Sequence, residues 1–264
     1  MKNHFIFGYE GNKREEVDKI YNSLNLDKIT TIVEPFCGTS ALSYYISTLH
    51  PKKYKYILND NNKILIELYN ILQDKEKLKI FEEKINEKAK NCDTKTKYLN
   101  EIKNWKTDVA DFYICHKIYK IRHGLYRLDY VYKYLDLSMC PIVKFLQEED
   151  VTIFNLDAIE IIKNNDNKKS LIFIDPPYLL SCNEYYDTLQ TTHQNIYEYM
   201  HYNDIKKYKC RFVCVIEKNW IINLLFEKIK NKIEYTKLYQ WKKRVTKHLI
   251  IRNFENNKPD IVYS

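Results

Sequence analysis

The tetrapeptide Asp175-Pro176-Pro177-Tyr178 combines residue types that suit the binding of a planar amino-heterocycle. The two prolines fix the backbone and remove two N–H donors, so the neighbouring carbonyl groups stay available as acceptors. The carboxylate of Asp175 can accept the hydrogens of an exocyclic amine, and the Tyr178 ring can stack on the base that carries that amine. The apolar residues 171–174 lead into this motif as a buried strand would. A plain strand end closed by a proline turn is the alternative interpretation.

A second polar loop follows the apolar residues 29–33 and contains Glu34, Phe36 and Gly38 before a predicted helix. Gly38 allows the backbone to approach a ligand closely, and the N-terminus of a helix presents free N–H groups. Glu34 can accept hydrogens from an amino group of such a ligand. An ordinary strand–helix turn explains the same residues without a ligand.

Two acids follow further predicted strands, at Asp60 and Asp157. An acid after the second strand is where α/β folds bind ribose hydroxyl groups, because a carboxylate only accepts hydrogen bonds. Asp157 is placed to contact the amine of an adenine. For both acids, capping of the helix that follows is the alternative interpretation.

The N-terminal residues 7–13, with Tyr9 and Lys13, hold two of the four glycines of the chain. An aromatic ring, a lysine and two glycines before a helix are compatible with contact to a ligand. A glycine loop without that role is the alternative.

Short apolar runs alternate with helical patterns along most of the chain, which predicts a mostly parallel sheet covered on both faces. Helices are expected over 63–72 and 221–229. The predicted strands are residues 29–35, 54–60, 151–156, 171–175, 211–217, 233–239 and 248–254.

Residues 74–149 interrupt this alternation and read as an inserted, mainly helical subdomain. Residues 74–90 form an amphipathic, charged helical pattern, and residues 97–119 form a second one. An aromatic and basic stretch, 120–134, follows. The sequence therefore predicts a catalytic domain made of residues 1–73 and 150–264, with the insertion between them.

The formal net charge of the 264 residues is +8, and the basic residues are unevenly distributed. Residues 228–252 contain nine lysines and arginines against Glu234 alone. Such a basic face favours a polyanionic partner, although a solvated lysine-rich surface is an equal alternative. The odd count of 7 cysteines, with no C-x-x-C pair, predicts free thiols and no metal. No signal peptide or membrane span is visible, so we expect a soluble intracellular protein.

The order of these motifs resembles that of the Dam-like (D12 class, α-group) DNA adenine-N6 methyltransferases, with phage-type Dam enzymes as the nearest pattern. Residues 8–13 (GYEGNK), 34–38 (EPFCG), 59–62 (NDNN) and DPPY follow one another in the order of that family, with an insertion before DPPY. Residues 124–127 and 245–253 are also similar. Two features depart from the pattern: Ser40 replaces a glycine, and the Phe-Asn-x-Pro-x-Gly hairpin is missing after Arg127. The second departure leaves the recognition sequence open.

The resemblance implies an α/β fold, namely a seven-stranded Rossmann-like sheet that binds S-adenosyl-L-methionine, with residues 74–149 as a helical target-recognition insertion. It implies that the target adenine is held by Asp175, Pro176, Pro177 and Tyr178. It implies a cofactor site made of Tyr9, Lys13, Glu34, Phe36, Gly38, Asp60 and Asp157.

The function that the resemblance implies is a site-specific DNA-methyltransferase that transfers a methyl group to a flipped-out adenine in double-stranded DNA, without a metal. A pseudo-methyltransferase that only binds nucleic acid, or a methyltransferase acting on RNA, cytosine N4 or a protein amide, is the alternative. A microbial cytoplasm is the expected location, with a virus or a mobile element as one source that the composition allows. The expected DNA contacts are Arg122, Arg127, Lys242, Lys243 and Arg244.

Overall fold

The computed structural model describes residues 4–9, 11–90, 102–121, 132–178, 196–200, 205–239 and 244–255. The chain divides into two compact units, and each is made of three segments. Unit 1 comprises Met1–Val17, Gly38–Lys55 and Asp60–Asn155. Unit 2 comprises Asp18–Cys37, Tyr56–Asn59 and Leu156–Ser264.

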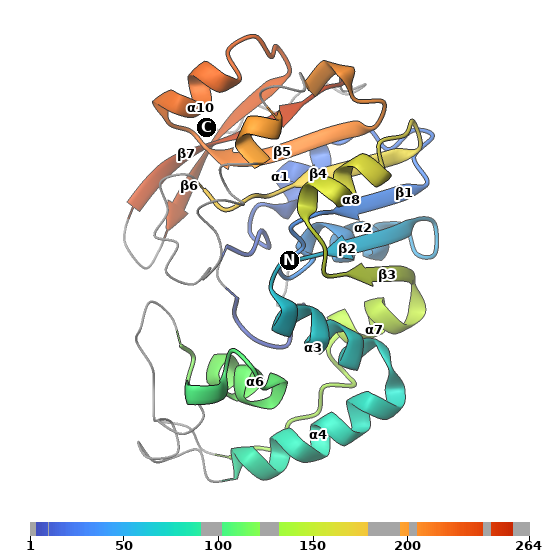
Figure 1. The fold of residues 1–264 in the computed structure, drawn as a ribbon, viewed down its shortest axis with the longest axis vertical. Coiled ribbons are helices and arrows are strands. Elements are labelled where there is room, and N and C mark those ends of the chain that lie inside the picture. Colours follow the sequence, from blue (N-terminus) through green and yellow to red (C-terminus); the bar gives the residue numbers. More distant parts are fainter. Residues whose placement is uncertain are drawn as a thin grey trace. The chain divides into compact units, whose positions relative to one another are not determined.

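Seven strands form one sheet in the order β3-β2-β1-β4-β5-β7-β6 (Figure 1), which confirms the predicted α/β fold class. All seven predicted strands are present. Their bounds are Thr31–Glu34 (β1), Lys55–Asn59 (β2), Asp150–Phe154 (β3), Ser170–Ile174 (β4), Arg211–Glu217 (β5), Lys232–Tyr239 (β6) and Arg244–Arg252 (β7).

The centre of unit 2 is a parallel arrangement of β1, β4 and β5. Val33 of β1 is level with Ile172 of β4, and Ile174 of β4 is level with Cys214 of β5. Every residue of β4 is buried, as expected for a parallel strand whose two faces are both covered. In Figure 1, α8 (Ala158–Asn164) crosses in front of these strands and α1 (Val17–Asn22) lies behind them.

The last two strands make the sheet mixed, because β7 runs antiparallel to both β5 and β6. β7 begins at Arg244, four residues before the predicted start at 248. The reason is long-range pairing, since β6 and β7 stay in register as far as Tyr239 and Arg244. Residues 244–247 lack a continuous apolar run, so the sequence alone did not indicate that the strand begins there.

Polar side chains bind the ends of some helices in the sheet-forming parts of the chain. α3 (Lys63–Gln73) is capped by Asn62, whose side-chain oxygen accepts the N–H of Leu65 at 3.3 Å. α2 (Ala41–Leu49) follows the loop after β1. α10 (Trp220–Leu225) is shorter than the predicted 221–229, and Lys232 donates to the carbonyl of Phe226, next to its C-terminus, at 2.9 Å.

The described residues of the predicted insertion form α4 (Lys75–Ala89), α6 (Val109–Lys117) and α7 (Pro141–Glu148), with no strand among them. All of them belong to unit 1. Residues 97–101 of the predicted helical pattern 97–119 lie outside the described residues, and residues 102–104 are helical. A turn follows, and Asp108 then caps α6 by accepting the N–H of Asp111 at 2.9 Å. That these residues recognise the target stays a prediction.

Aromatic side chains pack the N-terminal segment of unit 1 against α6. The Phe7 ring lies 5.7 Å from Phe112 and 5.0 Å from His116, measured between centroids. His116 also stacks on Tyr9 at 6.1 Å. Burial lowers the pKa of His116 to about 4, although its Nδ1 hydrogen-bonds the carbonyl of Phe112 at 2.9 Å. The imidazole is therefore a neutral member of an apolar cluster that supports Tyr9.

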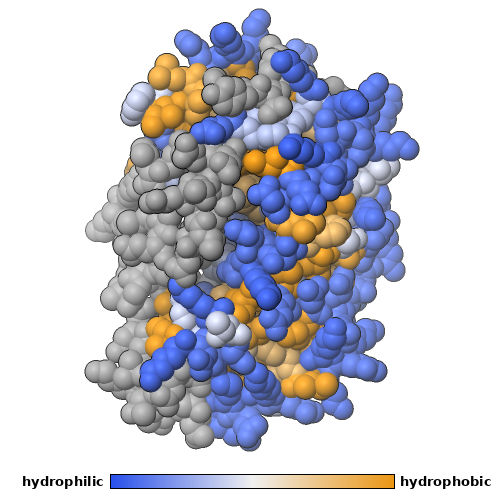
Figure 2. Space-filling model, viewed as in Figure 1, coloured by the Kyte–Doolittle hydropathy of each residue, from blue (hydrophilic) through white to orange (hydrophobic). Residues whose placement is uncertain are grey.

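On the face shown in Figure 2, most of the coloured surface is hydrophilic and hydrophobic residues gather in several places. One of these groups lies over α10, which exposes Trp220 and Leu224. A cross-strand pair in the β6–β7 hairpin, Leu238 and Val245, is also exposed. Exposed apolar side chains in ones and twos are ordinary for a protein surface.

Candidate functional site

The loop after β1 contains two residues with left-handed backbone conformation. Gly38 has φ +47° and Ser40 has φ +51°. A Cβ at Gly38 would lie 3.9 Å from Cε1 of Tyr9, an ordinary contact, so the glycine is needed for its conformation rather than for space. The hydroxyl of Tyr69 donates to the carbonyl of Gly38 at 2.9 Å and hydrogen-bonds Oγ of Ser40 at 3.0 Å. One side chain of α3 thus holds both residues.

The carboxylate of Asp60 fixes the same loop. Its Oδ2 accepts the N–H of Gly38 at 3.0 Å, and its Oδ1 accepts the N–H of Asn62 at 2.9 Å. Burial raises the pKa of Asp60, and the N–H groups of Asn62, Gly38 and Asn61 act in the opposite direction. Because Asn62 caps α3, Asp60 is not the capping residue considered as the alternative. A carboxylate has about four acceptor positions, so the N–H groups of Asn62, Gly38 and Asn61 still leave Asp60 able to accept from a hydroxyl group.

Tyr9 reaches this part of unit 1 from the N-terminus. Its hydroxyl accepts a hydrogen bond from Nδ2 of Asn62 at 3.4 Å, and its ring borders Gly38. Lys13 is buried, and its Nζ donates to the carbonyl of Gly11 at 3.1 Å. The structure therefore brings Tyr9, Gly38 and Asp60 together within one unit, although Tyr9 and Asp60 lie far apart in the sequence.

Asn59 is a residue of unit 2 to which the sequence assigned no role. Its side chain is fully buried, and its Nδ2 donates to the carbonyls of Pro35 at 2.9 Å and Leu156 at 3.0 Å. Its Oδ1 accepts the N–H of Leu156 at 2.8 Å, and its own carbonyl accepts the N–H of Cys37. One amide thus joins the end of β2 to the segments that carry Glu34, Phe36 and Asp157.

The remaining predicted cofactor residues of unit 2 differ in their surroundings. Glu34 ends β1 and is buried, with 2% of its surface exposed, while Phe36 is half-buried. Asp157 is exposed and caps α8, because its Oδ1 accepts the N–H of Ile159 at 2.8 Å and of Glu160 at 3.4 Å. The capping interpretation of Asp157 is therefore correct, and its contact with a cofactor stays a prediction.

The DPPY residues leave the end of β4, at the same edge as the end of β1, because the two strands are parallel and in register. Pro176 is buried, whereas Asp175, Pro177 and Tyr178 are half-buried. The carbonyl of Pro177 accepts a hydrogen bond from the hydroxyl of Tyr197 at 3.3 Å. The Tyr178 hydroxyl lies 3.3 Å from Nδ1 of His248. Neither Tyr197 nor His248 was singled out from the sequence, and a histidine within the apolar run of β7 was the one available signal.

The basic residues counted in 228–252 are not all available to a partner. Arg252 is buried and donates to the carbonyl of Ser23 at 2.9 Å. Lys232 binds the carbonyl of Phe226, and Nζ of Lys247 lies 2.8 Å from Glu234 Oε1. The predicted DNA contacts Arg122, Arg127, Lys242 and Lys243 lie outside the described residues, and Arg244 is described only as the first residue of β7.

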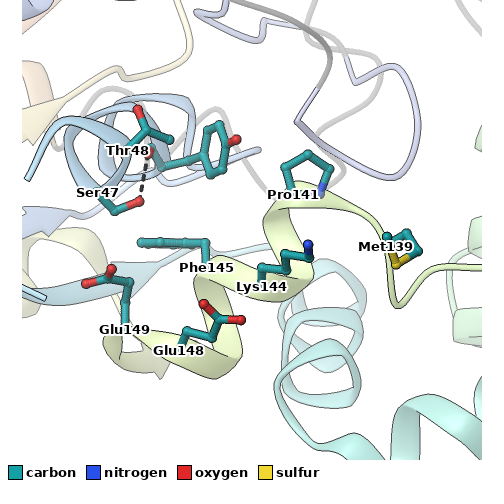
Figure 3. A pocket seen from close by; sticks show the side chains of 9 residues that line it. Ser47, Thr48, Met139, Pro141, Lys144, Phe145, Glu148 and Glu149 are labelled. Atoms are coloured by element: carbon teal, nitrogen blue, oxygen red, sulfur yellow. Dashed lines mark hydrogen bonds between the residues drawn. The ribbon is translucent and has the colours of Figure 1, made fainter. Parts of the chain in front are cut away.

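A surface pocket of about 330 Å³ lies beside α2 and α7 in unit 1, where Ser47, Phe145, Lys144 and Glu148 are among its lining residues (Figure 3). Its lining includes no predicted site residue. In the described part of the chain, no three His, Cys, Asp or Glu side chains are grouped as metal ligands would be. None of the described helices is long and apolar enough to cross a bilayer.

Two solved structures show distant similarity to the chain. One is from Listeria monocytogenes and is described as a class I S-adenosylmethionine-dependent methyltransferase, with 10% identity and a TM-score of 0.41. That match covers 94% of this chain, which spans 62% of the length of the Listeria chain. The second is the human methyltransferase 10 domain containing protein, with 8% identity and a TM-score of 0.36, covering 92% of this chain and 81% of that one. No curated protein matches the sequence.

A family model matches residues 9–140 and is described as D12 class N6 adenine-specific DNA methyltransferase. The matched residues are half of the chain and include Tyr9, Gly38 and Asp60 as well as most of the helical insertion. The DPPY motif lies beyond the matched residues and agrees with the match independently. The chain belongs to the D12 class N6 adenine-specific DNA methyltransferase family.

Proposed function

We propose that the chain transfers a methyl group from S-adenosyl-L-methionine to the N6 amino group of adenine in DNA. The observation that carries this proposal is the family match over residues 9–140. The DPPY motif at the end of β4 supports it from a separate part of the chain.

The residues predicted to hold the cofactor fit its chemistry. S-adenosyl-L-methionine presents ribose hydroxyls, amino groups and an aromatic base, which call for acceptors and for a ring. Glu34 is a buried acceptor, Asp60 is a half-buried one, and Tyr9 supplies a ring beside Gly38. When bound, the cofactor supplies a methyl group on a sulfonium centre. The cofactor contacts that we propose are Tyr9, Lys13, Glu34, Phe36, Gly38, Asp60 and Asp157.

The DPPY residues act on the adenine. Its N6 is a poor nucleophile because the lone pair is delocalised into the ring. Accepting the N6 hydrogens at Asp175 and at the carbonyl of Pro176 favours a more tetrahedral nitrogen whose lone pair can attack. Tyr178 stacks on the base, and Pro177 keeps the turn rigid. Most of the rate enhancement then comes from positioning and fixed dipoles.

The proposed substrate is double-stranded DNA, in which N6 cannot be reached while the base is stacked. The adenine must therefore rotate out of the helix, which costs a few kcal/mol and is offset by contacts in the pocket. Phosphate contacts from lysine and arginine side chains supply most of the affinity. Arg122, Arg127, Lys242, Lys243 and Arg244 stay the proposed contacts.

The test measures transfer of labelled methyl groups to unmethylated duplex DNA by the wild type and by Asp175→Asn. Asparagine keeps the shape of aspartate but replaces one acceptor oxygen by a donor. We expect N6-methyladenine in one short sequence motif for the wild type and loss of transfer for the variant, with cofactor binding retained. Transfer to RNA alone, or cofactor binding without any transfer, would contradict the proposal.

A further inference from the structure

His248 is a buried polar residue in the middle of β7, and its neighbours on both sides are fixed by strand pairing. It is level with Glu217 of β5 and with Tyr235 of β6. None of its surface is exposed. An imidazole in such a place is stable only if its nitrogens have hydrogen-bond partners.

Both ring nitrogens of His248 have a side-chain partner. Nδ1 lies 3.3 Å from the hydroxyl of Tyr178, and Nε2 lies 3.1 Å from Oγ1 of Thr246. A neutral imidazole has one donor and one acceptor nitrogen, so the partner on one nitrogen sets the role of the other. The three side chains therefore form a continuous hydrogen-bonded chain of Thr246, His248 and Tyr178, and the tautomer of His248 sets its direction.

The packing of the rings agrees with this arrangement. The Tyr178 ring meets the His248 ring edge to face, with 5.4 Å between centroids and 75° between planes. Tyr235 lies against the same imidazole at 5.5 Å. On the backbone side, the carbonyl of Pro177 accepts the hydroxyl of Tyr197. Tyr178 is thus held at its hydroxyl, along its ring and at the preceding peptide.

We propose that His248, oriented by Thr246, is a positioning residue that sets the plane of the Tyr178 ring for stacking on the target base. The inference rests on the proposed function, because that function gives Tyr178 its stacking role. The antiparallel hairpin β6–β7 then does more than complete the sheet, because its residue His248 orients Tyr178. A tyrosine–histidine pair that only stabilises the fold is the competing explanation.

A double-mutant cycle separates the two explanations. Tyr178→Phe removes the hydroxyl, and His248→Phe removes the ring nitrogens while keeping an aromatic side chain. We expect each variant to lower kcat about fivefold to tenfold, the effect of one hydrogen bond, with KM for the cofactor unchanged. The double variant should be no slower than the slower single variant, because both remove the same contact. Effects that multiply would overturn the inference.

A matched control uses the same substitution at another histidine that meets a tyrosine edge to face. The rings of His50 and Tyr54 lie 5.8 Å apart at 86°, in unit 1. His50→Phe should leave kcat unchanged, and an equal fall in both variants would indicate a general loss of stability. His248→Gln should retain part of kcat, because its amide can still hydrogen-bond the hydroxyl of Tyr178. If His248→Phe does not fold, Thr246→Val takes its place in the cycle.

A second measurement needs no methyl transfer, so the failure of the proposed function would not affect it. The ring ¹⁵N resonances of His248 are recorded in the wild type and in Tyr178→Phe, with His248→Gln for assignment. We expect the Nδ1 resonance to move when the tyrosine hydroxyl is removed. An unmoved resonance would overturn the inference even in an enzyme that methylates DNA.

Discussion

Asp60 accepts the backbone N–H of Gly38 on one carboxylate oxygen and the N–H of Asn62 on the other. The two contacts tie the loop after β1 to the start of α3. Asp60→Asn places an amide donor opposite one of these N–H groups. We expect cofactor affinity to fall at least about tenfold and the free energy of unfolding to fall by about 1–3 kcal/mol. Calorimetric titration and urea denaturation measure the two effects.

The matched control is Asp157→Asn, since asparagine caps a helix about as well as aspartate does. The capped α8 should keep its stability. A fall in cofactor affinity in this variant would support the proposed contact of Asp157, and unchanged affinity would restrict that residue to its capping role. If Asp60→Asn bound the cofactor as the wild type does, the proposed role of Asp60 would be wrong.

Asn59 should be among the residues least tolerant of an isosteric change. In Asn59→Asp, the nitrogen that donates to Pro35 and Leu156 becomes an oxygen that faces two carbonyl oxygens. We expect the free energy of unfolding to fall by about 2–5 kcal/mol, because buried acceptors lose their donors. Denaturant unfolding measures the loss. The same substitution at the exposed Asn167 should cost less than about 1 kcal/mol; similar losses at both positions would contradict the prediction.

Ser40 has a left-handed backbone with φ +51°, a conformation that suits glycine better than serine. Ser40→Ala keeps the unfavourable conformation and loses the hydrogen bond to Tyr69, so we expect it to lower the free energy of unfolding by about 1 kcal/mol. Ser40→Gly loses the same bond but removes the conformational cost, and should be the more stable of the two variants. Thermal unfolding measures the stability of the two variants. An alanine variant at least as stable as the glycine variant would contradict the prediction.

His116 predicts how stability depends on pH. Burial lowers its pKa from 6.5 to about 4 in the folded protein, so between these values the unfolded chain binds a proton that the folded chain does not. Stability should therefore fall as pH falls from 6.5 to 4, by up to about 1.4 kcal/mol per pH unit for this group. The pKa of His4 is lowered in the same way, to about 4, and adds to the slope.

His116→Phe keeps a ring in the cluster and removes the titration. Its unfolding free energy, measured by denaturant titration from pH 4 to 9, should fall less steeply on acidification than that of the wild type. Above pH 8 the two slopes should agree. A variant with the wild-type slope between pH 6.5 and 4 would show that another group is responsible.

The fold could be predicted from the sequence because each buried strand is a continuous apolar run, as β4 and β5 show. Strand ends were less predictable where pairing alone decides them. The start of β7 depends on its register with β6, and local polarity gives no sign of it. The helical pattern expected over 97–119 did not show the turn at residues 105–107, after which the carboxylate of Asp108 caps α6.

The motif residues of the candidate site could be predicted from the sequence, but the residues that hydrogen-bond to them and hold them in place could not. Asp60 and Asp175 could be found because each follows an apolar strand. His248, Asn59 and Tyr69 could not, since their partners come from other elements and only the folded chain brings them together. The charge count over residues 228–252 overstated the basic surface available to a partner. Arg252, for example, adds to the net charge but is buried.

The two compact units alternate along the chain, and the changes from one to the other include the bonds between Cys37 and Gly38 and between Asn59 and Asp60. No single cut through the gene yields either unit intact. A domain exchange that kept one unit and replaced the other would have to join several segments, two of them at the predicted cofactor residues. Recombination between relatives is therefore expected to preserve the loops around these predicted residues as whole blocks and to place its junctions elsewhere.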